Sequence, residues 1–160
     1  MTVYMLKQFQ ISENRLLNRL PEAGQPITFY AYMSSGEVNP SKHHTLIFDV
    51  VKTNAGNGYN NLSGLFTAPV SGLYVLACSI SMHGPGAYAS YKIIKNAEIV
   101  GTFFVDAEKE SEYRSSSVTV IVSLQVGDVL FVRTSSTYTP HGDVLSNAHD
   151  WSSVAGWLIQ

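Results

Sequence analysis

The stretch IFDVVKTNAGNGYNNLSGLFTAPVSGLYVLAC, residues 47–78, decides the fold that this chain can adopt. Its aromatic residues recur at irregular spacings that no amphipathic helix would produce. Glycines and one proline interrupt the stretch where the chain must reverse, because glycine enters positive-φ turns without steric cost and proline cannot continue a central strand. The stretch therefore predicts a strand, a glycine-rich turn, a short strand, a proline–glycine turn and a long apolar strand.

Outside this stretch, the chain from Ile27 onward reads as further strands and turns. Asn96 and Ala97 are compatible with a tight hairpin turn, and Gly127 and Asp128 form a second turn after a strongly β-branched run. Roughly nine or ten strands without an intervening helix predict an all-β protein, either a β-sandwich or a jelly roll. The expected loops cover residues 34–44, 107–116 and 136–151, and the further expected strands cover residues 27–33, 87–95, 98–105, 117–125, 129–135 and 152–160.

Residues 4–20 are the only helix-like stretch, with a broken apolar stripe at alternating spacings of three and four residues. Two interpretations stay open, the end of a coiled coil or a helical arm that rests on the domain. Pro21, Gly24 and Pro26 then end the helical pattern and mark a linker. We therefore expect an N-terminal arm and linker at residues 1–25 and a globular head domain at residues 26–160.

The composition excludes several classes of protein. The chain of 160 residues has room for one sizeable domain and a short appendage. Its formal charge of −2 gives no electrostatic case for binding nucleic acid or an anionic membrane. No apolar run approaches the roughly 18 residues of a membrane helix, and residues 1–20 lack the pattern of a signal peptide.

Charged residues make up only 14%, which indicates a buried oligomer face. The single cysteine, Cys78, lies among apolar residues and is expected to be buried and inert.

The spacing within residues 47–78 resembles the signature of the complement C1q globular-head family. That signature runs from an aromatic residue through Asn or Asp, a second aromatic residue and Phe to Gly-x-Tyr. The family usually continues with two more aromatic residues, where this chain has the core-facing Leu76 and Cys78. The positions that match in register are Phe48, Asn54, Tyr59, Phe66, Gly72 and Tyr74.

Other residues extend the resemblance from about Pro26 to Gln160. The resemblance implies a ten-stranded jelly roll similar to that of tumour necrosis factor. It also implies a secreted, extracellular protein that assembles as a homotrimer through apolar sheet faces. The supporting residues are Phe29 and Ala31 in the first strand, Leu124, Gly127 and Asp128 in a turn, and Gly156, Trp157 and Leu158 near the end.

The sequence shows no motif that predicts catalysis. Gly-x-Ser-x-Gly, His-Glu-x-x-His and a phosphate-cradling glycine loop are all missing, so we expect no enzymatic activity. Some members of the family bind calcium near the trimer axis through acids in the loop before the strand at 117–125. By register Asp106 corresponds to one such acid, but Arg114 replaces a second and would repel a cation. The sequence thus requires no cofactor and leaves calcium possible, with a solvated loop favoured.

Two groups of histidines have alternative interpretations. The imidazole and carboxylate groups in the 136–151 segment could surround a metal ion, although their spacing matches no tight motif and an ordinary polar loop is favoured. His43 and His44 read as part of an exposed loop. The possible metal group comprises His141, Asp143, His149 and Asp150.

Binding of a ligand through loops is the better-supported chemistry. Sugar recognition uses flat aromatic faces together with amide or carboxylate partners for hydroxyl groups, and loops on a rigid β-scaffold concentrate such residues. Arg114 could pair with a carboxylate, including that of sialic acid. A merely solvated loop is the alternative. The candidate ligand-binding residues are Tyr113, Arg114, Tyr138, His141, Asp143, Asn147 and Trp151.

One N-glycosylation sequon is present, at Asn61-Leu62-Ser63. Its place beside glycine-rich turns predicts that the Asn61 side chain is exposed.

The sequence thus predicts a secreted, trimeric, lectin-like module without catalytic activity. It would bind glycans or bacterial surface polymers in innate immunity, without partners among nucleic acids and without membrane insertion. The alternative is a protein-binding extracellular ligand or a structural matrix trimer, resembling the cytokine-like or synapse-organiser-like members of the family.

Overall fold

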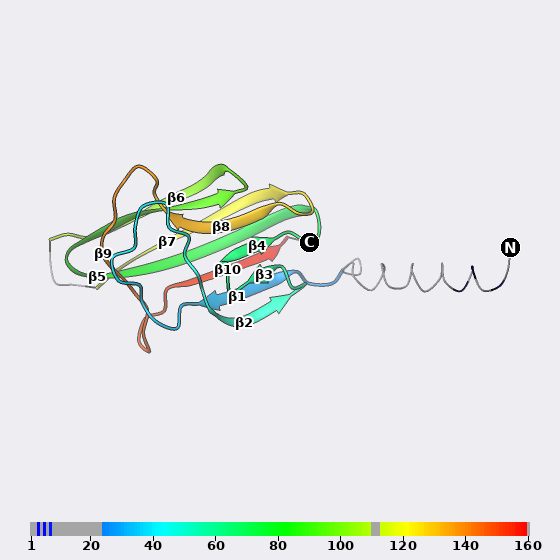
Figure 1. Cartoon of the computed structure of the whole chain (residues 1–160), viewed down its shortest axis with the longest axis horizontal. Helices are drawn as coiled ribbons and strands as arrows, with labels where there is room; N and C mark the ends of the chain where they lie inside the picture. Colours follow the sequence, from blue (N-terminus) through cyan, green and yellow to red (C-terminus); the bar gives the residue numbers. More distant parts are fainter. Residues whose placement is uncertain (1–2, 4, 6, 8–23, 110–112, 160) are drawn as a thin grey trace.

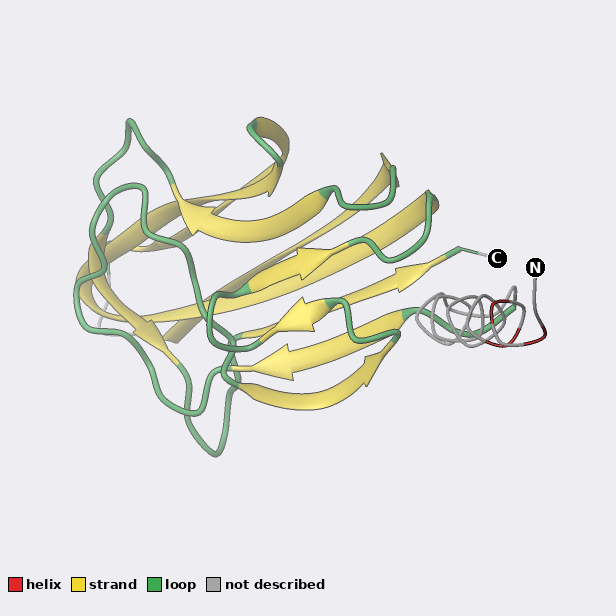
Figure 2. Cartoon of the chain, turned by 45° about the vertical axis from the view of Figure 1, so that its right-hand side comes forward, coloured by secondary structure: helices red, strands yellow, loops and turns green. Residues whose placement is uncertain are grey.

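A computed structural model describes residues 3, 5, 7, 24–109 and 113–159 of the chain. From residue 24 onward the described residues form an all-β fold, which confirms the predicted jelly roll, and loops gather at the two ends of the strands (Figure 2). The expected arm at residues 1–25 lies almost entirely outside the described residues. The strands are β1 (Thr28–Tyr32), β2 (Val50–Ala55), β3 (Tyr59–Asn60), β4 (Leu65–Thr67), β5 (Gly72–Lys95), β6 (Glu98–Ala107), β7 (Tyr113–Leu124), β8 (Val129–Thr134), β9 (His141–Leu145) and β10 (Ser153–Leu158).

The long strand β5 belongs to both layers of the sandwich (Figure 1). Its first half pairs with β10 and β7, and its second half pairs with β6 and β8. The strand turns back at Gly84-Pro85-Gly86, where Gly84 has a φ of 124° and Gly86 a φ of 76°, values that favour glycine. We call β2-β1-β10-β5-β7 the front layer and β3-β4-β8-β5-β6 the back layer, and β9 pairs with β5 on both sides of the bend.

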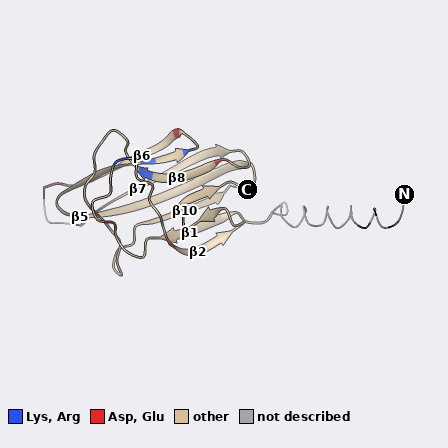
Figure 3. Cartoon of the chain, in the orientation of Figure 1, with Lys and Arg blue, Asp and Glu red and all other residues tan. Residues whose placement is uncertain are grey.

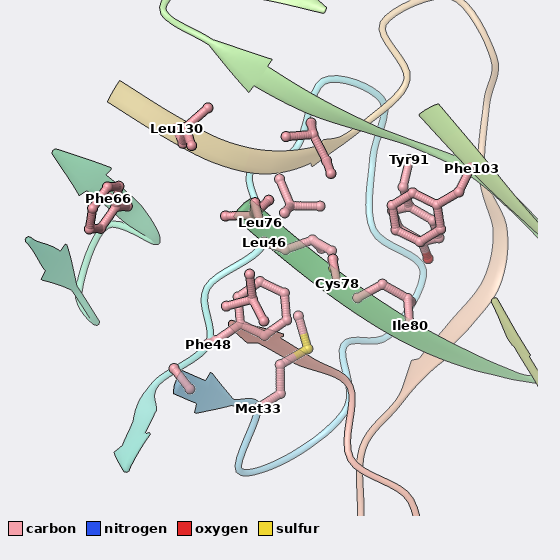
Figure 4. Close-up of a cluster of buried hydrophobic side chains, with 14 of the residues drawn as sticks. Met33, Leu46, Phe48, Phe66, Leu76, Cys78, Ile80, Tyr91, Phe103 and Leu130 are labelled. Carbon is pink, nitrogen blue, oxygen red and sulfur yellow. The ribbon is translucent and has the colours of Figure 1, made fainter. Parts of the chain in front are cut away.

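The aromatic residues of the 47–78 signature form the centre of the core between the layers. The ring of Phe29 stacks on Tyr59 and on Phe66, with 4.9 Å between the centroids in each pair. The ring of Phe66 also contacts Tyr74 at 5.5 Å. All four side chains are buried, as is Phe48, whose place in the core Figure 4 shows. The signature spacing therefore reflects which rings meet when the strands pair.

The hydroxyl group of Tyr59 ties the core to the loop that precedes β2. It donates a hydrogen bond to the carbonyl oxygen of Phe48 at 3.1 Å and accepts one from the Phe48 amide at 3.2 Å. Burial raises the pKa of Tyr59 to about 12, so this hydroxyl stays protonated at physiological pH. The Asn54 side chain also bonds to both backbone groups of Tyr59, which closes the glycine turn between β2 and β3.

The thiol of Cys78 is buried in the same core, as its apolar neighbours in the sequence predict. Burial raises the pKa of this thiol, because the low-dielectric interior disfavours the thiolate. Cys78 is therefore a packing residue.

Two expected loops are partly wrong. The segment 136–151 contains strand β9, and residues Tyr113 to Ser116 of the segment 107–116 belong to β7. Strand β9 is hard to read from the sequence because only Val144 within it is fully buried, and its polar residues lie along the bend of β5. His141 and Asp143 therefore lie on a strand rather than in the loop where the sequence placed them.

The hairpin between β5 and β6 turns at Asn96 and Ala97, as predicted, with a φ of 54° at Asn96. The Asn96 side chain donates to a carboxylate oxygen of Asp128 at 3.0 Å and accepts from the Val129 amide at 2.9 Å. The second carboxylate oxygen of Asp128 accepts from the Gln125 amide at 2.9 Å. The hairpin and the β7–β8 turn are thus joined through one carboxylate.

Substituting Gly156→Ala should destabilise the domain by about 1–3 kcal/mol, since the added methyl overpacks the core. A Cβ at this position would lie 2.4 Å from the Phe29 ring, which is itself held between two other rings. Urea unfolding followed by fluorescence measures the change, with Ser153→Ala on the same strand as the control. An unchanged midpoint for Gly156→Ala would contradict the stacking constraint.

Acid should weaken the tie at Asp128. Hydrogen bonds from Asn96 and from the Gln125 amide hold the pKa of Asp128 below its usual value. Because the folded pKa is depressed, the stabilisation is present above the unfolded pKa of about 4 and is lost as pH falls through the folded pKa. Urea midpoints at pH 7 and at acid pH should therefore differ less for Asp128→Asn than for the wild type. Glu98→Gln controls for net charge, and equal acid sensitivity of wild type and Asp128→Asn would refute the assignment.

Candidate functional site

Four aromatic side chains lie together on the outer surface at the bend of β5, and we call them the aromatic cluster. Tyr88 on β5 pairs in register with His141 on β9, and their rings lie 4.7 Å apart. Tyr138, from the β8–β9 loop, lies 5.6 Å from the Tyr88 ring and 5.7 Å from Phe104 of β6. Tyr88 and Phe104 lie 6.3 Å apart. Three strands and a loop, distant in the sequence, thus contribute one ring each.

The rings of the aromatic cluster face solvent. Phe104 is 42% exposed and Tyr138 is 46% exposed, although both are large enough to fill a core position. Centroid separations of this size mean that the rings touch each other, which leaves no gap between them for an enclosed cation. The cluster is therefore a platform of ring faces and edges, suited to stacking against a flat apolar surface.

Local hydrogen bonds hold Tyr138 in the cluster. The hydroxyl of Ser135 accepts from the amides of Thr137 at 3.2 Å and of Tyr138 at 3.1 Å, which forms a serine turn. The Ser135 amide in turn donates to the carbonyl of Ser90 on β5 at 2.8 Å. The loop that carries Tyr138 is therefore fixed to the back layer at its base.

The phenol of Tyr88 remains a neutral hydrogen-bond donor. Desolvation, followed by the nearby Tyr138 and Glu108, raises the pKa of Tyr88. A neutral phenol can donate to and accept from hydroxyl groups of a ligand. The cluster thus combines stacking surface with polar groups at its rim.

Two other predicted ligand-binding residues have structural partners. Asp143 accepts a hydrogen bond from the Asn39 amide at 3.0 Å, which joins β9 to the 34–44 loop. The side-chain oxygen of Asn147 accepts from the amides of His149 at 2.8 Å and Asp150 at 3.2 Å. Both side chains therefore shape the loops at this end of the domain.

The remaining predicted residues lie away from the aromatic cluster. Trp151 stacks on Tyr32 of the front layer, with 3.8 Å between centroids and 6° between the ring planes. Tyr113 stacks on His83 at 4.5 Å, and Arg114 follows it at the start of β7. The seven predicted residues therefore do not form one site. Tyr138 and His141 meet at the Tyr88 ring, whereas Tyr113 and Asp143 flank His83 in register.

Sequence reasoning missed Tyr88 and Phe104. Phe104 could have been found, because Phe103 and Phe104 are consecutive in a strand and must point to opposite faces. Phe103 is buried and Phe104 is exposed. For Tyr88 the signal was weaker, since its alternation with Ala87 and Ala89 fits either face.

The predicted metal and glycosylation residues are also placed. Asp106 lies opposite Tyr88 in register, and its carboxylate accepts from the Glu108 amide at 3.0 Å. Among the described residues, no three His, Cys, Asp or Glu side chains gather closely enough to hold a metal ion. Asn61 lies in an exposed turn, where its side-chain nitrogen donates to the carbonyl of Asp49 at 3.0 Å.

In the described part of the chain, the outer face of the front layer carries no charged side chain on β1, β10, β5 and β7. Thr28, Trp157 and Val75 are neighbours in register, and Ile121 of β7 follows Val75. Ile121 is 67% exposed and Trp157 is 42% exposed. We call this surface the uncharged face; its residues are Thr28, Tyr30 and Tyr32 of β1, Ser153, Ala155 and Trp157 of β10, Val75, Ala77 and Ser79 of β5, and Ser117, Thr119 and Ile121 of β7.

Among the described residues, no helix has the length and apolar character needed to cross a bilayer.

The architecture defines the class of fold, a jelly-roll domain of the type found in C1q and tumour necrosis factor structures. The model of the C1q domain matches residues 28–159, and the chain belongs to the C1q domain family. Membership is consistent with an extracellular recognition or ligand-binding module, and members of this family are generally non-enzymatic.

Two curated relatives match the chain along most of its length, and a third matches a shorter part. The complement C1q tumor necrosis factor-related protein 3 of Homo sapiens and that of Mus musculus are each 28% identical over 130 residues, which cover 81% of this chain and 50% of the relative. Human multimerin-2 is 38% identical over 65 residues, 41% of this chain and 6% of that protein. The chain thus spans about half the length of the first two relatives.

Solved structures share the fold at low sequence identity. The globular domain of zebrafish complement 1qA protein superposes with a TM-score of 0.64 at 16% identity, covering 84% of this chain and 98% of that chain. The Eiger TNF of S. frugiperda gives a TM-score of 0.60 at 16% identity, covering 85% and 94%. These likenesses concern the fold alone.

Proposed function

We propose that this domain is the head of a secreted homotrimer that recognises glycans on microbial or host surfaces in innate immunity. The observation that carries the proposal is the aromatic cluster, in which Phe104 and Tyr138 are large, exposed and held in place by neighbouring rings. Rigid exposed rings bind the apolar face of a sugar without losing side-chain freedom. The phenols and the His141 imidazole supply hydrogen bonds to hydroxyl groups.

The homotrimer is supported by the uncharged face. An exposed surface with Trp157 and Ile121 and without charges on its central strands has the composition of an interface core. Three copies that each present this face around a threefold axis would bury it, which also explains the low share of charged residues. The aromatic cluster belongs to the back layer and would remain accessible in such an assembly.

A protein-binding ligand is the second candidate function. It is favoured by the similarity to the complement C1q tumor necrosis factor-related protein 3 and by the fold shared with Eiger TNF. In that case the aromatic cluster would be the hot spot of a protein interface. A pull-down from extracellular fluid with and without competing sugars separates the two, because only a lectin loses its partners to the sugars.

Light scattering should give about three chains per particle for the wild type. Ile121→Asp should shift the protein to monomers, because burying an unpaired charge in each of three interfaces is unfavourable. Leu62→Asp is the matched control, since Leu62 is 83% exposed in the β3–β4 turn, outside the uncharged face. A wild-type monomer at micromolar concentration, or a trimer of Ile121→Asp, would refute the assignment of this face.

Glycan binding is tested on a glycan array with the wild-type protein and Tyr138→Ala. We expect discrete sugar ligands for the wild type and a loss of about tenfold or more in affinity for the variant, since stacking contributes on the order of 1 kcal/mol beyond area burial. Tyr113→Ala is the control, an exposed tyrosine outside the cluster. Absence of any sugar or bacterial polymer among the ligands would sink the proposal. A loss confined to Tyr113→Ala would move the site to the start of β7.

A further inference from the structure

The outer surface of the back layer carries cationic side chains next to the aromatic cluster. Lys92 on β5 and Arg133 on β8 are direct partners in register. Figure 3 shows basic positions, drawn blue, on strands of the back layer, including the arrowhead of β8. Alternate residues of β5 face outward, so Ser90 is the outward residue before Lys92, and Tyr88 is the outward residue before Ser90. Ser90 pairs in register with Phe104 of β6. The cations and the rings therefore share one face of one sheet.

Neighbouring groups hold the cations in place. The ammonium of Lys92 donates to the Thr102 hydroxyl at 2.6 Å. The guanidinium of Arg133 lies against the His43 ring, with a nitrogen–nitrogen distance of 2.8 Å. The exposed Lys42 precedes His43 in a loop that bonds to the Ser135 carbonyl through the His43 amide at 3.0 Å. We call Lys42, Lys92 and Arg133 the cationic strip.

Acidic side chains do not neutralise the cationic strip. In the described part of the chain, the ion pairs that form join Glu37 to His44 and Lys95 to Asp128, and none involves Lys92 or Arg133. Asp106 faces the same side of the sheet as the cationic strip. It pairs in register with Tyr88, at the end of the aromatic cluster that lies away from Lys92. An anion would therefore be attracted at one end of this surface and repelled at the other, which gives a bound ligand one orientation.

We propose that this surface binds an acidic oligosaccharide, with a sugar ring on the aromatic cluster and a carboxylate or sulfate group on Lys92 and Arg133. The proposal rests on the glycan-binding function above and names its substrate class. Alternate residues of a strand lie about 7 Å apart, so Tyr88 and Lys92 are about 13 Å apart, a span that a short oligosaccharide covers. Guanidinium and ammonium groups form charge-assisted hydrogen bonds with carboxylate and sulfate oxygens.

The test compares tetrasaccharides of matched length by calorimetry on the full chain at fixed ionic strength. The probes are chitotetraose, which is neutral, a hyaluronan tetrasaccharide, which carries carboxylates, and a heparin tetrasaccharide, which also carries sulfates. We expect the acidic probes to bind more tightly than chitotetraose. Lys92→Gln should weaken the binding of the acidic probes about tenfold or more and leave the binding of chitotetraose unchanged. Arg133→Gln should act likewise, with thermal melting to check its fold. Lys52→Gln, a strand lysine of the front layer, is the matched control and should change nothing.

The outcomes separate this inference from the function on which it rests. Suppose that chitotetraose binds and that Tyr138→Ala abolishes its binding. If the acidic probes then bind no more tightly than chitotetraose, or if Lys92→Gln does not weaken their binding, the glycan function stands and the acidic site is overturned. If no tetrasaccharide binds, both are overturned. Inorganic polyphosphate is a final arm. Equal binding of polyphosphate and the acidic sugars, unaffected by Tyr138→Ala, would mean a general polyanion surface and would also overturn the proposal.

Discussion

The stacking of Phe29 between Tyr59 and Phe66 is the constraint on which the rest of the structure depends. It brings β1, β3 and β4 to one point between the layers, and it requires bare backbone at Gly156 on β10 because the Phe29 ring occupies the space of a side chain. Rings that are stacked and buried cannot move aside without opening a cavity. The first and last strands are therefore locked together in the middle of the front layer (Figure 1).

The bend of β5 has a comparable role for the surface. Because one strand serves both layers, its turn at Gly84-Pro85-Gly86 fixes where the back layer begins relative to the front layer. The bend also creates the edge on which β9 pairs, and that pairing sets His141 beside Tyr88. The candidate site thus depends on the same strand that carries the core.

The two outer faces of the sandwich differ in chemistry, and this difference underlies the proposed division of roles. The uncharged face has the composition of a surface that is buried in an assembly. The back layer instead presents aromatic rings and cations, which can bind ligands as long as they stay accessible to solvent in the assembly. Under this proposal assembly and recognition use opposite sides of the domain, so that a trimer could present three copies of one weak site and gain avidity.

The sequence by itself determined the core and the family, because buried positions must repeat with the strand period and turns need glycine, proline or asparagine. The sequence pattern alone identifies Phe48, Tyr59 and Phe66 for that reason. The tertiary structure alone decided the site. Tyr88, Phe104 and Tyr138 come from segments separated by 16 and 34 residues, and exposed side chains carry no burial signal that would link them. Only the register of paired strands makes them neighbours, and register depends on packing across the whole sandwich.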